Sequence, residues 1–220
     1  MLNFTTSEEN YIKTIFHLQN EDGNVTTNEL AGLLKAKPAS ITDMMKKLKI
    51  RKLVHYQRYR GFRLTTEGNK IALGIIRRHR LWEFFLAEKL KFNWDEVHEV
   101  AEHLEHVSSK KLVDKLDEYL DYPKFDPHGD PIPDEHGKME NIKQTCLSDW
   151  PLNKKAIVCQ VMNQSSSLLE LIHYNKINIG TRLVVKKKFD YDHSIEIKIQ
   201  RQSPVTISKQ LANTIFVNHG

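Results

Sequence analysis

Apolar side chains recur with helical spacing along the first fifty residues of the chain. Residues 6–19 carry them on one side, and Thr6 and Glu9 have the spacing of a capping box, which predicts that a helix begins there. A shorter helical pattern follows a second capping box, and a third runs from Pro38 to about Lys49. Two short β-type runs with a charged tip between them come next, so the expected order is helix, helix-turn-helix and two-stranded wing.

After the predicted wing the helical pattern lengthens and then stops. Two long helices are predicted, from Thr66 to about Leu90 and from Asn93 to about Leu120, and both exceed what a minimal DNA-binding module requires. Residues 122–137 hold four of the seven prolines and are predicted to form a connector with little regular structure.

The C-terminal part changes to a composition that is typical of strands. Three β-rich runs separated by turn residues predict a small β-barrel-like domain; they are 157–161, 182–188 and 195–199. The expected fold class is mainly α with β, and the expected domains are residues 1–65, 66–138 and 150–220.

The composition, with 40% hydrophobic and 28% charged residues, excludes disordered, collagen-like and disulfide-framework proteins. No apolar stretch is long enough for a membrane helix and the N-terminus lacks secretory-leader features, so a cytoplasmic protein with no membrane partner is expected. The net charge of +5 conceals three blocks, which are +8 over residues 1–80, −9 over 81–150 and +6 over 151–220. The basic first block predicts a polyanionic partner, and the acidic middle block predicts bound cations.

The basic block coincides with the predicted helix-turn-helix and wing. In such a module one helix enters the major groove, basic side chains hold phosphates, and short polar side chains read base edges. The positions expected to contact DNA are Lys37, Ala39, Ser40, Thr42, Asp43, Lys46, Lys47, Arg58 and Arg60. A small helical domain with a merely solvated basic face is the alternative.

Histidine and glutamate side chains cluster on one face of the second long helix. At about 100 degrees per residue, two of each fall within an arc of about 100 degrees, separate from the apolar positions. These four residues are His98, Glu102, Glu105 and His106. On the preceding helix His79 and Glu83 share a face, and nitrogen and oxygen ligands without thiolate suit Mn²⁺, Fe²⁺ or Co²⁺ better than a structural zinc site.

This face of the helix allows other interpretations. A solvated helix surface also carries Glu and His, because charged residues are mostly exposed. A zincin motif fails because His98-Glu99 is followed by the next histidine at position 103, one residue too late. The Glu-x-x-His pairs of di-iron bundles, Gly-rich phosphate loops and GxSxG motifs are also missing, so no enzyme is expected.

A family resemblance covers nearly the whole chain. The segments that carry it are the opening Thr-Ser-Glu-Glu-Asn-Tyr-Ile helix, Lys37 to Thr42, Arg60 to Thr65, Arg78 to Leu81, Val97 to His106 and Pro127 to Pro133. In them the chain resembles the diphtheria-toxin-repressor/manganese-transport-regulator family of metal-dependent transcription factors. The resemblance implies a homodimer, a winged helix-turn-helix that binds a palindromic operator in double-stranded DNA, a helical dimerisation domain with two metal sites, and an SH3-like C-terminal domain.

The resemblance also implies the metal ligands. The regulatory site would use His79, Glu102, Glu105 and His106, with Asn10 from the first helix. The other site would use Glu83, His98, Asp126 and His128, with Asn163 or Gln164 from the C-terminal domain. Iron-type members carry cysteine at the position of Glu102, so the carboxylate indicates the manganese-type subgroup, with Fe²⁺ as the alternative cofactor. For Asp126 and His128 a simple exposed connector is the alternative.

The expected function is a metal-dependent repressor of metal-uptake genes, with Mn²⁺ as corepressor. Bound metal would neutralise the carboxylates, which otherwise repel one another. It would thereby favour a spacing of the two recognition helices that matches successive major grooves, about 34 Å apart. Two competing classes are a metal-dependent hydrolase or storage protein, and a metal-independent winged-helix regulator of some small ligand.

Overall fold

The computed structural model describes residues 4–19, 23–57, 60–94, 96–107, 109–141, 143–162 and 165–219. Their contacts divide the chain into two compact units. The first consists of Met1–His79, Leu104–Lys110 and Pro133–Lys138, and the second of Arg80–His103, Lys111–Ile132 and Met139–Gly220. Two continuous helices, α4 (Thr66–Glu88) and α5 (Val97–Val107), contribute residues to both units.

The first unit opens with α1 (Thr6–Leu18), and its capping box lies one residue earlier than predicted. The Thr5 hydroxyl accepts a hydrogen bond from the Glu8 N–H at 3.2 Å, and the Glu8 carboxylate accepts one from the Thr5 N–H at 2.9 Å. The predicted pair of Thr6 with Glu9 is therefore wrong. The sequence contains two overlapping Thr-x-x-Glu pairs, and burial of Glu8 against two cations at the C-terminal end of α3 selects the first.

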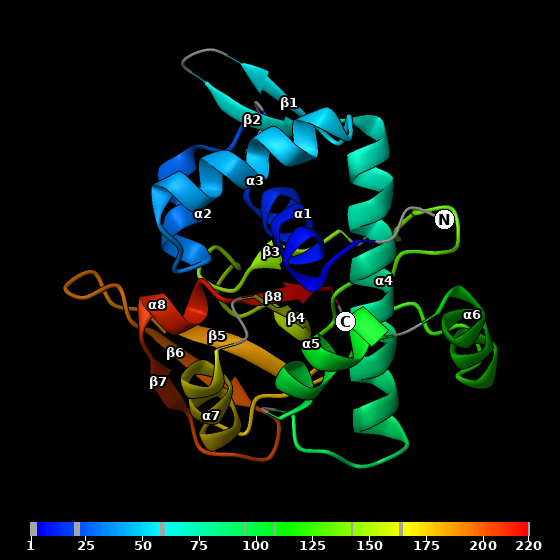
Figure 1. Cartoon of the computed structure of the whole chain (residues 1–220). Helices are drawn as coiled ribbons and strands as arrows, with labels where there is room; N and C mark the ends of the chain where they lie inside the picture. The colour runs from blue at the N-terminus through cyan, green and yellow to red at the C-terminus, as the bar shows by residue number, and fades with distance from the viewer. Residues whose placement is uncertain are drawn as a thin grey trace. The chain divides into compact units, whose positions relative to one another are not determined.

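The predicted helix-turn-helix and wing are confirmed. The elements after α1 are α2 (Thr27–Leu33), α3 (Pro38–Ile50), β1 (Val54–Gln57) and β2 (Gly61–Leu64). The two strands pair antiparallel and project as a hairpin beside α3 (Figure 1, cyan). Val25 exchanges backbone hydrogen bonds of 2.7 and 2.8 Å with Phe62, which anchors the wing to the segment before α2. Gly61 has a φ of +106°, and a Cβ there would overlap the carbonyl of Val25, so this close approach requires glycine.

The core of the first unit joins the helices to the wing and to the start of α4. Ile12 and Ile15 of α1, Ile41 and Leu48 of α3, and Ile75 of α4 have no exposed surface. These are the periodic apolar positions of the sequence, and their burial leaves the polar side of α3 facing outward.

The second long helix predicted by the sequence is two helices in the structure. After α5 ends at Val107, α6 (Lys110–Tyr119) begins, so the prediction of one helix from Asn93 to about Leu120 is wrong. The sequence carries a Ser-Ser pair at this point, and serine favours helix caps because its hydroxyl competes for backbone groups. The Asn93 N–H still donates to the Glu96 carboxylate at 3.1 Å.

The helical part of the second unit has its own small core. Leu81 of α4 packs with apolar side chains of α6 and with Ile132 of the connector. Among the described residues 122–137 there is no helix or strand, and a single bridge joins Phe125 to Pro131, as the proline content predicted.

The C-terminal part of the second unit is a six-stranded antiparallel sheet. Its strands, in the order in which they lie side by side, are β3 (Thr145–Cys146), β8 (Ile215–Asn218), β4 (Lys155–Val161), β5 (Arg182–Lys188), β6 (Ile195–Ile199) and β7 (Val205–Ile207). The three predicted strands are confirmed, and three short ones escaped prediction. Two helices, α7 (Ser166–Tyr174) and α8 (Lys209–Ala212), were also missed. Within the described part of the chain, no helix has the length and apolar character that a membrane span requires.

Candidate metal centres

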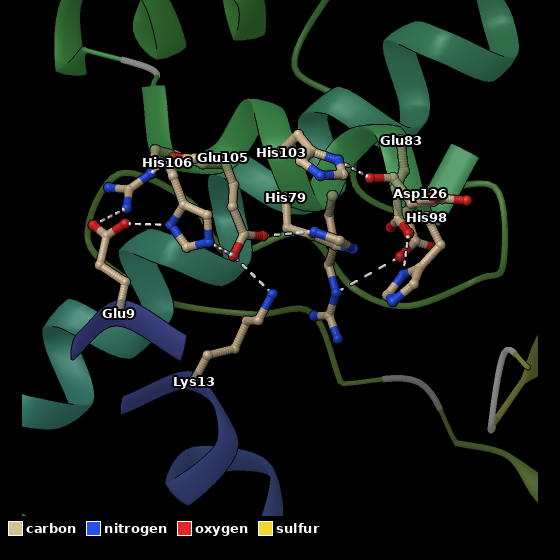
Figure 2. A network of polar contacts seen from close by, with 12 residues as sticks. Glu9, Lys13, His79, Glu83, His98, His103, Glu105, His106 and Asp126 are labelled. Atoms are coloured by element: carbon tan, nitrogen blue, oxygen red, sulfur yellow. Dashed lines mark hydrogen bonds and ion pairs between the residues drawn. The ribbon is translucent and has the colours of Figure 1, made fainter. Parts of the chain in front are cut away.

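The first group of candidate ligands lies in the first unit and consists of His79, Glu105 and His106; we call it the first cluster. His106 is held by a carboxylate of α1, because its Nδ1 lies 2.6 Å from Glu9 Oε2 (Figure 2). Arg78 fixes Glu9 in turn, with 2.6 Å between its guanidinium and Glu9 Oε1. A histidine that donates from Nδ1 to a carboxylate presents the lone pair of Nε2 to a metal. His106 Nε2 is buried and has no hydrogen-bond partner among the described residues.

Glu105 is the buried anion of the first cluster. Its side chain has no exposed surface, its Oε2 lies 2.6 Å from His79 Nδ1, and its Oε1 lies 3.5 Å from His106 Nε2. The same Oε1 accepts a 2.7 Å hydrogen bond from Lys13. Burial raises the pKa of Glu105, but the hydrogen bond and charge of His79 and the charge of Lys13 outweigh it and hold that pKa below its usual value.

Two further candidates belong to the elements that carry this cluster. Glu102 is half-buried on α5, one turn before His106 and three residues before Glu105, so it shares their side of the helix. Asn10 lies on α1, and its Oδ1 is buried without a hydrogen-bond partner among the described residues. A buried amide oxygen without a donor is costly, and a cation would satisfy it.

The second group of candidate ligands lies in the second unit and consists of Glu83, His98, Asp126 and His128; we call it the second cluster. Glu83 of α4 is only 1% exposed, and its Oε1 lies 3.1 Å from His98 Nδ1 and 4.0 Å from His128 Nε2. The side chain of His98 is 49% exposed. Two imidazoles therefore approach one oxygen of a buried carboxylate, with one side open to solvent.

Asp126 shapes the turn that carries His128. Its Oδ1 accepts hydrogen bonds from the N–H groups of His128 and Asp130 at 2.8 and 2.9 Å, and its Oδ2 lies 3.6 Å from Arg80. Burial raises the pKa of Asp126 well above its usual range, and the charges of Glu83 and Asp130 raise it further, while Arg80 opposes them. Acids gathered in this way repel one another, and a cation would relieve that repulsion.

The exposed-connector alternative for Asp126 and His128 is wrong, because these side chains are only 5% and 0% exposed. The ring of Trp94 stacks on His128 with a centroid separation of 5.1 Å, and the Val161 N–H donates to the His128 carbonyl at 3.0 Å. Gly129, at a φ of +86°, lets the turn lie directly on the backbone of β4. The turn is thus packed on the sheet domain.

The candidate DNA-contacting side chains that the structure describes face solvent, on or beside α3 and at the tip of the wing. Those that the structure describes are Lys37, Ala39, Ser40, Thr42, Asp43, Lys46, Lys47 and Arg60, and each is exposed. Arg58 of the wing lies outside the described residues, as do Asn163 and Gln164, the candidate C-terminal ligands. Lys46 is 3.1 Å from Asp43, and Lys47 is 3.3 Å from Glu8.

Three residues of the first cluster's surroundings were not found from the sequence as functional. Glu9 was predicted to close the capping box, and the overlapping Thr-x-x-Glu pairs were the hint against this, because only one glutamate can close the box. Arg78 entered the prediction only as part of the Arg78 to Leu81 family motif, and Lys13 only as a position where, by resemblance, one manganese regulator carries a carboxylate.

The chemistry of both clusters is nitrogen and oxygen, without sulfur. Cys146 and Cys159 belong to strands of the sheet domain and are free thiols. Imidazole with carboxylate and amide oxygen suits divalent ions of the Mn²⁺ and Fe²⁺ kind, whereas thiolate would favour zinc. A winged helix-turn-helix with an exposed basic face, in a chain whose helices gather such donors, defines a metal-responsive DNA-binding protein.

Comparison with known proteins agrees with this class. Residues 3–62 match the family model described as iron dependent repressor, N-terminal DNA binding domain, and residues 65–134 match its metal binding and dimerisation domain. The transcriptional regulator MntR of Oceanobacillus iheyensis is 34% identical over 153 residues, which cover 69% of this chain and 97% of the relative. The chain belongs to the iron-dependent repressor family, the family of MntR, and is a metal-dependent transcriptional repressor with DNA-binding and metal-binding domains.

Solved structures extend the similarity to the whole chain. A manganese-dependent transcriptional repressor in complex with manganese is 29% identical, with a TM-score of 0.86 over 97% of this chain and 100% of that one. The structure of ScaR with bound Cd²⁺ is 31% identical, with a TM-score of 0.81 over 97% of this chain and 99% of that chain. These matches include the C-terminal sheet domain, which confirms the family resemblance deduced from the sequence motifs.

Proposed function

We propose that this chain is a homodimeric repressor that binds palindromic operators of metal-uptake genes when Mn²⁺ is bound, with Fe²⁺ as the alternative ion. The observation that carries the proposal is the buried carboxylate of Glu105, which lies between the imidazoles of His79 and His106. The same face of α5 carries a second carboxylate, that of Glu102. Several solved structures with this fold are of proteins named for manganese, among them a manganese-dependent transcriptional repressor, the manganese regulator SloR and the manganese-activated repressor ScaR. Regulators with these functions are not enzymes, and we propose no catalytic role.

The proposed regulatory ligands are His79, Glu102, Glu105 and His106, with the amide oxygen of Asn10. Three observations support this set. Among the described residues His106 Nε2 and Asn10 Oδ1 are buried without a hydrogen-bond partner, and Glu102 lies one turn from His106. A divalent cation at this site would neutralise the carboxylates of Glu102 and Glu105, which share one face of α5.

The proposed second site uses Glu83, His98, Asp126 and His128. The burial of Glu83, Asp126 and His128, and the approach of both imidazoles to Glu83, support it. Asn163 remains the candidate for a fifth ligand, by family resemblance alone. We also propose the domain boundaries 1–65, 66–138 and 150–220, with an SH3-like C-terminal domain.

Helix α1 provides a physical link between the proposed metal ligands and α3, the proposed recognition helix. On one side Glu9 and Lys13 hold His106 and Glu105 of α5. On the other side Glu8 is bound to Arg51, the C-cap residue of α3, at 2.6 Å. A change in how α1 is held by α5 is therefore transmitted to α3, and two such helices in a dimer would take or lose the spacing of adjacent major grooves.

The proposed division of labour on DNA follows side-chain chemistry. Lysines and arginines of α3 and the wing hold phosphates, and Ser40, Thr42 and Asp43 read base edges. Lys37, Lys46, Lys47, Arg58 and Arg60 make up the phosphate-binding set. Since its target is chromosomal DNA, we place the protein in the cytoplasm.

The experiment that tests the proposal is binding of the full chain to its own promoter region at one fixed salt concentration, because phosphate contacts make affinity salt-dependent. Binding is expected with Mn²⁺ and lost with chelator. His106→Gln is expected to abolish the metal response, while His103→Gln, an exposed histidine of the same helix, leaves it intact. Chelator-insensitive binding would favour a metal-independent regulator, and metal loading without DNA binding would favour a storage protein or hydrolase.

A further inference from the structure

The first cluster contains a cation of its own, the ammonium group of Lys13. Lys13 Nζ lies 2.7 Å from Glu105 Oε1, and Figure 2 shows the side chain reaching from α1 to that carboxylate. The lysine side chain is 14% exposed and the glutamate side chain is not exposed at all. This is therefore a largely buried ion pair, unlike the pairs of exposed surface lysines.

The ammonium group and a metal ion would need the same oxygen. Glu105 Oε1 also lies 3.5 Å from His106 Nε2, the imidazole nitrogen that has no hydrogen-bond partner among the described residues. The lone pairs of Oε1 that would face a metal are therefore the ones that Lys13 contacts. A hard divalent ion binds a carboxylate oxygen at about 2.1 Å. An ammonium group already in contact with that oxygen repels such an ion strongly, because both are positive and the site is shielded from water.

We propose that Lys13 is a built-in competitor of the metal, which neutralises Glu105 in the metal-free protein and must leave Oε1 when the ion binds. This inference rests on the proposed function of the first cluster as the regulatory site. The flexible four-carbon stem of lysine allows the departure, and the ammonium then reaches solvent beside α1. Lys13 thereby raises the metal concentration at which the repressor responds.

Formation of the Lys13–Glu105 ion pair and binding of the metal oppose each other, because each disfavours the other. Breaking the Lys13 ion pair is part of the free energy of metal binding, so removing the charge should tighten metal affinity. A lysine that merely positioned Glu105 for the metal would have the opposite effect, because its loss would weaken binding. The direction of the change therefore separates competition from support.

The first test measures Mn²⁺ affinity of the full chain, without DNA, by competition with a chelating fluorophore. Lys13→Gln is expected to lower the Kd by about tenfold or more. Lys13→Arg keeps the charge and is not expected to tighten binding. Lys70→Gln is the matched control, since Lys70 is an exposed lysine of the same unit and its loss removes the same charge.

Three outcomes overturn the inference while leaving the proposed function standing. These are an unchanged Kd in Lys13→Gln, a weaker one, and an equal tightening in Lys70→Gln, which would indicate a general charge effect. Failure of the proposed function has a different signature, namely that the wild-type chain itself does not bind Mn²⁺ or does not use it to bind DNA.

The second test uses the wild-type chain and so does not depend on how a variant folds. An amine-reactive ester is applied with saturating Mn²⁺ or with chelator, and the labelled lysines are located by peptide mass spectrometry. Release of Lys13 from Glu105 predicts faster labelling of Lys13 with Mn²⁺, with Lys70 as the internal reference. Equal or slower labelling of Lys13 overturns the inference.

Discussion

Replacing Glu8 by glutamine removes the negative charge that joins α1 to α3. The carboxylate is 1% exposed, accepts a hydrogen bond from the Thr5 N–H at 2.9 Å, and lies 2.6 Å from Arg51 and 3.3 Å from Lys47. Glutamine has nearly the same shape, so the change tests charge and hydrogen bonding rather than packing. The change removes the carboxylate that Arg51, which is 20% exposed, contacts in the wild-type protein.

The magnitude follows from the pKa of Glu8. Burial opposes ionisation, but the Thr5 backbone hydrogen bond and the contacts with Arg51 and Lys47 outweigh it and lower the pKa from 4.5 to about 2. At about 1.4 kcal/mol per pKa unit, ionised Glu8 stabilises the folded state by at most about 3.5 kcal/mol. Because glutamine keeps part of the capping interaction, the expected loss in Glu8→Gln is about 2 kcal/mol near neutral pH.

The stabilising effect of Glu8 depends on pH in a direction that follows from its lowered pKa. A carboxyl with a lowered pKa stabilises the folded state above its unfolded pKa of 4.5, and this contribution disappears as the pH falls towards about 2. Urea unfolding of the full chain with chelator present, at a series of pH values, should show a difference between wild type and Glu8→Gln that narrows below about pH 4.5.

The matched control for this prediction is Glu67→Gln. Glu67 is 61% exposed and 4.0 Å from Lys70, and a surface pair of this kind is worth about 0.5 kcal/mol or less. A loss in Glu8→Gln no larger than this, or a difference that widens as the pH falls from about 5 to 3, would refute the reasoning from charge.

Three further predictions concern the metal, the connector and DNA. Glu102→Cys supplies a softer ligand and should shift the metal preference from Mn²⁺ towards Fe²⁺, measured as DNA binding against each ion; an unchanged preference removes the main support for the manganese assignment. Gly129→Ala places a Cβ on the carbonyl of Cys159, at a positive φ that alanine rarely adopts. The free energy of unfolding, measured in urea, should therefore fall by about 2 kcal/mol or more. A fall of less than about 0.5 kcal/mol would contradict the packing of this turn. Arg60→Ala should weaken binding to all DNA sequences alike and reduce the salt slope by about 1, and a change restricted to one operator would instead indicate base readout.

Much of the candidate site could be predicted from one-dimensional spacing. His79 and Glu83 share a face of α4, and Glu102, Glu105 and His106 share a face of α5, because residues three and four apart are neighbours on any helix. The elements of the winged helix-turn-helix were predictable for the same reason, since their apolar positions follow the period of the structure they form. These properties are local and depend on few residues.

Other features had no local signal. The short strands β3, β7 and β8 and the helices α7 and α8 depend on partners distant in the sequence. The connector could be recognised as irregular, but its folded turn depends on Arg80 and on the backbone of β4. Sequence spacing does not say whether such a turn is packed or solvated.

The sequence by itself determined which residue types stand on which helix face and therefore the metal chemistry that the chain can offer. The tertiary structure alone decided which charges meet. Glu8 closes the cap because cations of α3 lie against it, and this leaves Glu9 to hold His106 and Lys13 to hold Glu105. The physical reason is that a helical period fixes direction within one element, whereas burial and charge compensation arise only when separate elements pack.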